Sequence, residues 1–85
     1  MKSEKPIIQT DFINTRLPYI KGTCSGFNVI NVYNHNFSLV KSVTGIKDKF
    51  VINIEDVIVN NAFVLTAIES GKEESDYSRI LTKKL

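Results

Sequence analysis

Cys24 and His35 are the residues of this sequence best suited to nucleophilic chemistry, and each is the single residue of its type. Cys24 lies in the string Gly-Thr-Cys-Ser-Gly over residues 22–26, which has the spacing of a nucleophile elbow. An elbow needs a strand before the nucleophile and a helix after it, whereas the residues that follow here are typical of a strand. A cysteine nucleophile also needs a base, and His35 is the one histidine available.

The predicted separation of Cys24 and His35 argues against a catalytic pair. Residues 24–35 span about 35 Å when extended, which is too far for a hydrogen bond within one chain. We therefore interpret the Cys24 segment as a loop or bulge that enters a long strand. One histidine and one cysteine are also fewer ligands than a zinc site uses, and the acidic residues lack calcium-loop spacing. No phosphate-binding glycine loop is present, so we predict a protein that is not an enzyme and needs no cofactor or metal.

Length and composition predict one domain over residues 1–85. One cysteine cannot form an internal disulfide, which excludes a disulfide framework and favours a cytoplasmic location. No apolar run reaches the length of a signal peptide or of a membrane span, so we expect no membrane contact. Abundant Ile and Asn with scarce Ala and Arg indicate a bacterial or phage genome.

The residue types predict a sheet to position these side chains. β-branched residues are common and suit a pleated strand better than a helix. We predict a mainly β (α+β) fold, a small antiparallel sheet or barrel of four to five strands with a short C-terminal helix. Its parts are an N-terminal segment over residues 1–25, an antiparallel meander over residues 26–69 and a C-terminal helix or tail over residues 70–85.

The first predicted hairpin turns at Asn34-His35. A two-residue loop there keeps apolar side chains opposite one another, whereas a three-residue loop mixes the two faces. The expected cross-strand pairs are Val32 with Phe37, Ile30 with Leu39, and Val29 with Val40. His35 is therefore interpreted as a turn residue whose exposed tip is free to touch a partner.

The second predicted hairpin turns at Asn60-Asn61, and the segment Ser42–Phe50 joins the two hairpins through a turn. Its core face contains Phe50, Ile52, Ile54 and Ile58 opposite Phe63, Leu65 and Ala67. Asp56 falls into this apolar face by alternation. A break at Glu55-Asp56 that lifts the carboxylate to solvent is favoured over a buried acid with a raised pKa, because an unpaired buried charge is expensive.

The C-terminal residues have a helical pattern. Ser70 and Glu73 have capping-box spacing, and acidic residues precede basic ones as a helix dipole favours. Tyr77, Ile80 and Leu81 form one apolar stripe. This stripe is expected to pack on the sheet, or to dock on a partner.

Protein binding is the function that we expect, since both faces of the predicted sheet are apolar and one helix covers only part of the second face. The chain is interpreted as an adaptor, inhibitor or regulator that binds another protein or itself as a homo-oligomer. The expected contact residues are Val57, Val59, Val64, Ile68 and Tyr77.

Nucleic-acid binding is the alternative. Residues 1–49 contain seven Lys/Arg and three Asp/Glu, and small sheets bind single strands through exposed aromatic residues framed by cations. The residues expected to contact nucleic acid are Arg16, Tyr19, Lys21, Tyr33, Lys47 and Lys49.

Overall fold

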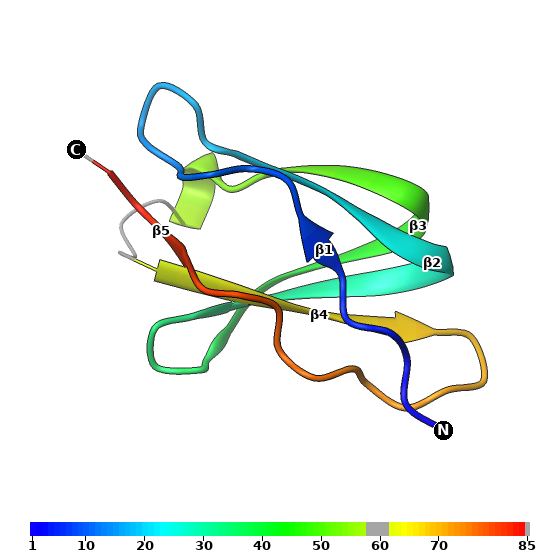
Figure 1. The fold of residues 1–85 in the computed structure, drawn as a ribbon. Helices are drawn as coiled ribbons and strands as arrows, with labels where there is room; N and C mark the ends of the chain where they lie inside the picture. Colours follow the sequence, from blue (N-terminus) through cyan, green and yellow to red (C-terminus); the bar gives the residue numbers. More distant parts are fainter. Residues whose placement is uncertain (58–61, 85) are drawn as a thin grey trace.

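The computed structural model describes residues 1–57 and 62–84, apart from the side chains of Phe27 and Asn28. The elements are β1 (Ile7–Ile8), β2 (Tyr19–Asn34), β3 (Leu39–Asn53), the 3-10 helix η1 (Glu55–Val57), β4 (Ala62–Glu69) and β5 (Leu81–Thr82) (Figure 1). The mainly β, antiparallel fold predicted from the sequence is confirmed.

The long strand β2 is the centre of the sheet. β3 pairs with both halves of β2 along one edge, while β1 and β4 pair with its first and second halves along the other edge. β5 pairs with β4. Because β2 and β3 bend together, the sheet curls into a half-barrel, with its two halves facing each other (Figure 1).

The bend lies at the Cys24 segment, and the bulge predicted there is confirmed. Thr23 pairs with Lys49 and Phe27 with Lys47, so residues 24–26 of β2 lie opposite the single residue Asp48 of β3. Gly26 and Asp48 have φ angles of 67° and 63°, in the left-handed region that lets a strand change direction. The sheet therefore folds over at this point without ending either strand.

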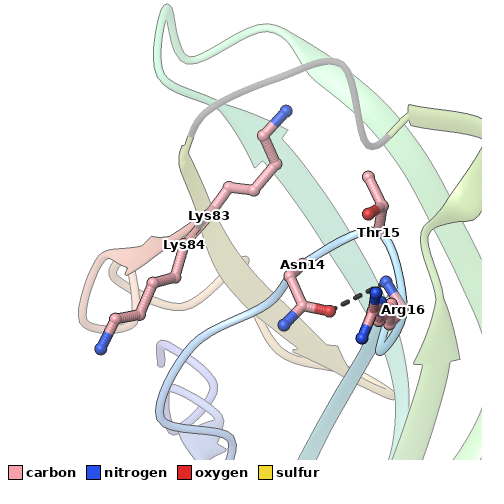
Figure 2. Close-up of a pocket in the computed structure, with 5 residues that line it drawn as sticks. All are labelled: Asn14, Thr15, Arg16, Lys83 and Lys84. Atoms are coloured by element: carbon pink, nitrogen blue, oxygen red, sulfur yellow. Dashed lines mark hydrogen bonds between the residues drawn. The ribbon is translucent and has the colours of Figure 1, made fainter.

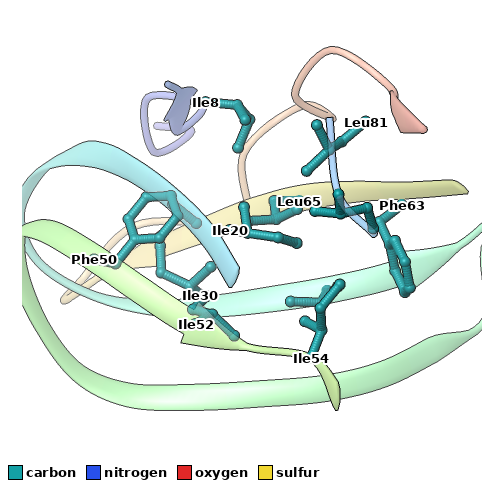
Figure 3. Close-up of a cluster of buried hydrophobic side chains, with 12 residues drawn as sticks. Ile8, Ile20, Ile30, Phe50, Ile52, Ile54, Phe63, Leu65 and Leu81 are labelled. Carbon is teal, nitrogen blue, oxygen red and sulfur yellow. The ribbon is translucent and has the colours of Figure 1, made fainter. Parts of the chain in front are cut away.

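The core fills the inside of the curl (Figure 3). The face predicted for the second hairpin is confirmed, since its members that the structure describes are buried: Phe50, Ile52, Ile54, Phe63, Leu65 and Ala67. Ile58 and the Asn60-Asn61 turn lie outside the described residues. Other segments contribute Ile8, Ile13, Ile20, Ile30, Val32 and Leu81.

The register predicted for the first hairpin is wrong. Tyr33 pairs with Leu39 and Ile30 with Val43, so residues 35–38 form a four-residue loop. The side-chain Oδ1 of Asn34 accepts hydrogen bonds from the backbone N–H groups of Asn36 and Ser38, at 2.9 and 3.1 Å. This local bonding stabilises the longer loop and overrides the apolar matching used for the prediction. His35 is exposed in the turn, as predicted.

The predicted meander is also wrong. β4 pairs with β2 and not with β3, and the segment Ser42–Phe50 belongs to one continuous strand. Positive φ angles at Gly45 and Asp48 are absorbed as irregularities within β3, where the prediction placed a turn. Asp56 lies in η1 with its carboxylate exposed, 3.2 Å from the Lys41 ammonium, which confirms the predicted break.

The predicted C-terminal helix is wrong, because residues 74–80 run extended along the edge of β4. The Ser75 N–H donates to the Ala67 carbonyl, and the Ala67 N–H donates to the Ser75 Oγ. Ser78 and Leu65 form the same pair of hydrogen bonds. Leu81 continues the row opposite Phe63. Buried residues in this tail thus recur every three positions, at 75, 78 and 81, and serine hydroxyls satisfy the strand edge that a helix would leave unpaired.

The other side of the tail contacts the N-terminal segment. Lys2 Nζ lies 2.7 Å from the Asp76 carboxylate, and Arg79 donates to the carbonyl oxygens of Ile8 and Thr10 at 3.1 and 2.6 Å. The tail therefore lies between β4 and the N-terminal residues, and it closes the curled sheet along one side (Figure 1).

Gly22 permits the close packing of β1 on β2. A Cβ atom at Gly22 would lie 2.4 Å from the Ile7 carbonyl oxygen and 2.4 Å from the Phe50 ring. We expect Gly22→Ala to lower the free energy of unfolding by about 1–3 kcal/mol in urea denaturation, as overpacking does. Thr44→Ala, at an exposed site of β3, is the control and should stay within about 0.5 kcal/mol of wild type. Equal stability of the two variants would contradict this packing.

The serines of the tail generate a second prediction. Ser75→Ala and Ser78→Ala each leave a buried β4 N–H without its acceptor, which costs about 1–3 kcal/mol of unfolding free energy. Hydrogen exchange should accelerate at the amides of Ala67 and Leu65, respectively. The exposed Ser70→Ala is the control. Unchanged exchange at both amides would mean that the hydroxyls do not cap the edge.

Candidate functional site

The structure does not bring Cys24 and His35 together. Cys24 lies partly buried against the core at the bulge, while His35 lies exposed in the loop beyond the end of β2. The paired backbone of β2 from Phe27 to Asn34 separates them. Within residues 1–57 and 62–84, no three His, Cys, Asp or Glu side chains are grouped so that they could hold a metal ion.

An aromatic cluster, formed by Tyr33, Phe37 and Tyr77, is the most distinctive surface feature. The Tyr33 and Tyr77 rings pack edge to face with centroids 5.6 Å apart, and the centroid of the Phe37 ring lies 5.0 Å from that of Tyr77. Phe37 is 57% exposed and Tyr77 is 47% exposed. The three rings come from the end of β2, the loop after it and the tail, so folding brings together residues distant in sequence.

Apolar side chains extend the aromatic cluster. Leu39 pairs with Tyr33 across the hairpin and is 55% exposed, and Ile80 of the tail is 63% exposed. Beside them is a hollow of about 90 Å³, lined by Asn34, His35, Phe37, Ala62, Phe63, Val64 and Ile80. Apart from Asn34 and His35, the lining residues are apolar. The cluster and its hollow thus form an apolar surface at the hairpin end of the molecule.

A carboxylate fixes the base of the aromatic cluster. Glu74 Oε2 accepts hydrogen bonds from the Tyr33 hydroxyl and the Thr66 hydroxyl, each at 2.5 Å, and from the Asn31 amide at 3.5 Å. Asn31 in turn accepts a bond from Ser42 at 2.7 Å. The bonds from Thr66 and Tyr33 lower the pKa of Glu74, and the bond to Glu74 raises the pKa of Tyr33. The network orients Tyr33 and ties the tail to the outer face of β2.

The residues predicted to bind a protein occupy different environments. Tyr77 is exposed in the aromatic cluster, whereas Val64 is buried and Val57 and Ile68 are half-buried. Val59 lies outside the described residues. The tail runs along β4, so this part of the sheet is not the open apolar face that the predicted helix would have left.

The residues predicted to bind nucleic acid separate into two groups. Tyr19, Lys21 and Lys49 share one exposed face of β2 and β3 before the bulge, with Arg16 in the preceding loop and Lys47 beyond the bulge. Tyr33 belongs to the aromatic cluster at the other end of β2.

Phe37, Leu39 and Ile80 are surface residues that the sequence did not predict. Phe37 and Leu39 were expected in a core row, because the two-residue loop placed them opposite Val32 and Ile30. The run Asn34-His35-Asn36 is the signal that could have predicted the longer loop, since Asn side chains bond to the backbone ahead of them.

Comparisons with known proteins give a likeness of fold. No protein-family model and no curated protein matches this sequence. A solved structure described as "Biofilm associated protein - BSP domain" superimposes with a TM-score of 0.70 over 96% of this chain, at 17% sequence identity. The chain spans 14% of the length of that neighbour. At this identity the likeness shows that the two share a fold.

Within residues 1–57 and 62–84, no helix is long and apolar enough to cross a membrane.

Glu74 generates a prediction about pH. Because its pKa in the folded chain is lowered from the ordinary 4.5, its contribution to stability is present above pH 4.5 and is lost as the pH falls through the lowered pKa. We expect the free energy of unfolding of wild type to fall in acid, and Glu74→Gln to reduce that fall.

Asp76, whose pKa is lowered by Lys2, contributes with the same sign, so Asp76→Asn measures its separate share. Urea denaturation across the acidic range is the measurement. An acid slope that is identical in wild type and Glu74→Gln would contradict the role given to Glu74.

Proposed function

We propose that this chain is a non-enzymatic protein-binding β-domain whose contact surface is the aromatic cluster with Leu39 and Ile80. The observation that carries the proposal is the group of three mutually packed, solvent-exposed aromatic rings beside an apolar hollow. Aromatic residues dominate the energetics of protein interfaces, because they bury a large area and lose rotational freedom about only a few bonds.

The rigidity of the aromatic cluster supports this function. Tyr33 is held by Glu74, and Tyr77 lies between Tyr33 and Phe37. A surface that is already ordered pays little conformational entropy when a partner binds. The hollow next to Phe37 and Ile80 offers a place for an apolar anchor of the partner.

The fold likeness and the sequence support the setting of this proposal. The neighbour is a domain within a much longer chain, and its name connects it with biofilms. A domain that binds other proteins through its surface agrees with the position of the neighbour in a longer chain and with its name. We keep the roles expected from the sequence as part of this proposal. They are those of an adaptor, inhibitor or regulator of bacterial or phage origin that acts in the cytoplasm and self-associates.

Site-specific cross-linking tests the proposal. A photo-crosslinking amino acid placed at position 37 or 80 should form an adduct with a protein partner in the native host. The same amino acid at position 70, exposed at the far end of β4, should form none. An adduct with the mass of two copies would identify self-association, whereas equal adducts from all three positions, or none, would overturn the proposal.

Affinity measured with the captured partner gives the magnitude. Phe37→Ser and Ile80→Asp should each weaken binding by about thirtyfold or more if these residues are hot spots. Both side chains are largely exposed, so the variants should remain folded by circular dichroism. Unchanged affinity in both variants would place the contact elsewhere.

A further inference from the structure

The outer face of the sheet before the bulge presents two lysines together with an exposed tyrosine and an exposed valine. The cross-strand pairs on this face are Tyr19 with Asn53, Lys21 with Val51, and Thr23 with Lys49. Tyr19 is 41% exposed and Val51 is 62% exposed, and Lys21 and Lys49 are also exposed. Alternate residues of both strands point into the core, so buried packing supports the backbone beneath this face.

The charges on this face are unbalanced. The strand segments that pair before the bulge, residues 19–23 and 49–53, contain two lysines, Lys21 and Lys49, and no acidic residue. Lys41 is paired with Asp56, and elsewhere Lys2 and Lys72 are paired with Asp76 and Glu69. Among the described residues, Lys21, Lys49 and Arg16 make no ion pair. Lys21, Lys49 and Arg16 are therefore available to an outside anion.

A cationic hollow includes Arg16, which lies in the loop before β2. Asn14, Thr15, Arg16, Lys83 and Lys84 line a space of about 370 Å³ (Figure 2). Asn14 Oδ1 accepts the backbone N–H groups of Arg16 and Leu17 at 2.9 and 2.8 Å, which fixes the loop that carries Arg16. The Lys84 ammonium lies 5.1 Å from the centre of the Phe12 ring, a cation–π contact. Arg16 is therefore held between the hollow and the start of β2.

We propose that this cationic strip, defined as Arg16, Tyr19, Lys21 and Lys49, binds single-stranded nucleic acid without sequence preference. Lys21 of β2 and Lys49 of β3 are diagonal neighbours across the two strands, at a separation of about 7–8 Å that lets each meet a phosphate. The exposed Tyr19 ring offers a stacking surface for a base. An exposed aromatic ring next to unpaired cations is the combination that sheets use to bind single-stranded nucleic acid, and Tyr19 supplies that ring. The strip contains none of the residues of the aromatic cluster, so the two surfaces are independent.

Binding of a fluorescein-labelled single-stranded oligonucleotide, followed by fluorescence anisotropy, tests this proposal. Affinity should fall as salt rises from about 50 to about 200 mM, since phosphate contacts release counterions. The double variant Lys21→Gln, Lys49→Gln should weaken binding roughly tenfold to a hundredfold and reduce the salt slope by about 1.4. The control Lys2→Gln, Lys72→Gln has the same net charge and should bind nearly as wild type, because it removes exposed ion pairs of small energy.

Tyr19 distinguishes nucleic acid from other polyanions. Tyr19→Ala should weaken oligonucleotide binding by about tenfold, and Tyr19→Phe should preserve it, because stacking needs only the ring. Polyphosphate and polyglutamate, which have no bases, should bind more weakly than the oligonucleotide and should not respond to Tyr19→Ala. Equal binding of all three polymers would assign the strip to an acidic protein or another polyanion and overturn the proposal.

The proposals for the aromatic cluster and for the cationic strip can be contradicted separately. Phe37→Ser should leave oligonucleotide affinity unchanged, and the lysine variants should leave protein cross-linking from position 37 unchanged. An equal loss of oligonucleotide affinity in the Lys21, Lys49 variant and in its control would also overturn the strip, because it would show a net-charge effect without a site.

Discussion

The outer edge of β4 imposes the constraint on which the rest of the structure depends. Its buried N–H groups must find acceptors, and the tail supplies them through the hydroxyls of Ser75 and Ser78. Each hydroxyl also donates to the carbonyl of the next residue, so its own hydrogen is satisfied. Once the tail is fixed on β4, its other positions are determined: Glu74, Tyr77 and Ile80 are directed to one side, and Asp76 and Arg79 contact the N-terminal segment.

The bulge between Thr23 and Phe27 divides one long ribbon into two surfaces with different chemistry. Beyond it, β2 ends in the aromatic cluster, where rings from the hairpin and the tail pack together. Before it, the outer face presents Tyr19 with unpaired cations. Because the ribbon bends at this point, both halves bury their inner side chains in one core while their outer faces point in different directions (Figure 1).

The sequence predicted features that depend on neighbours along the chain. Alternation identified the core face from Phe50 to Ala67, small residues identified the bulge at Cys24, and the cost of burying a charge placed Asp56 in solvent. The strand that pairs with β4 could not be predicted, since apolar alternation with a period of two fits β4 against β2 as well as against β3. The tail was predicted wrongly for a related reason. Tyr77, Ile80 and Leu81 fit a helical stripe, whereas the spacing of three between Ser75, Ser78 and Leu81 can be recognised only when β4 lies beside them.

The sequence by itself determined the class of the fold, the core face from Phe50 to Ala67 and the place of the turn that contains His35, because β-branched alternation and turn residues act locally. Tertiary structure alone decided which strands pair, what the tail does and where both candidate surfaces lie. The physical reason is that a strand edge and a serine hydroxyl satisfy each other only after folding brings them within hydrogen-bond distance. Tyr33, Phe37 and Tyr77 are scattered in the sequence, and they become one surface through that contact.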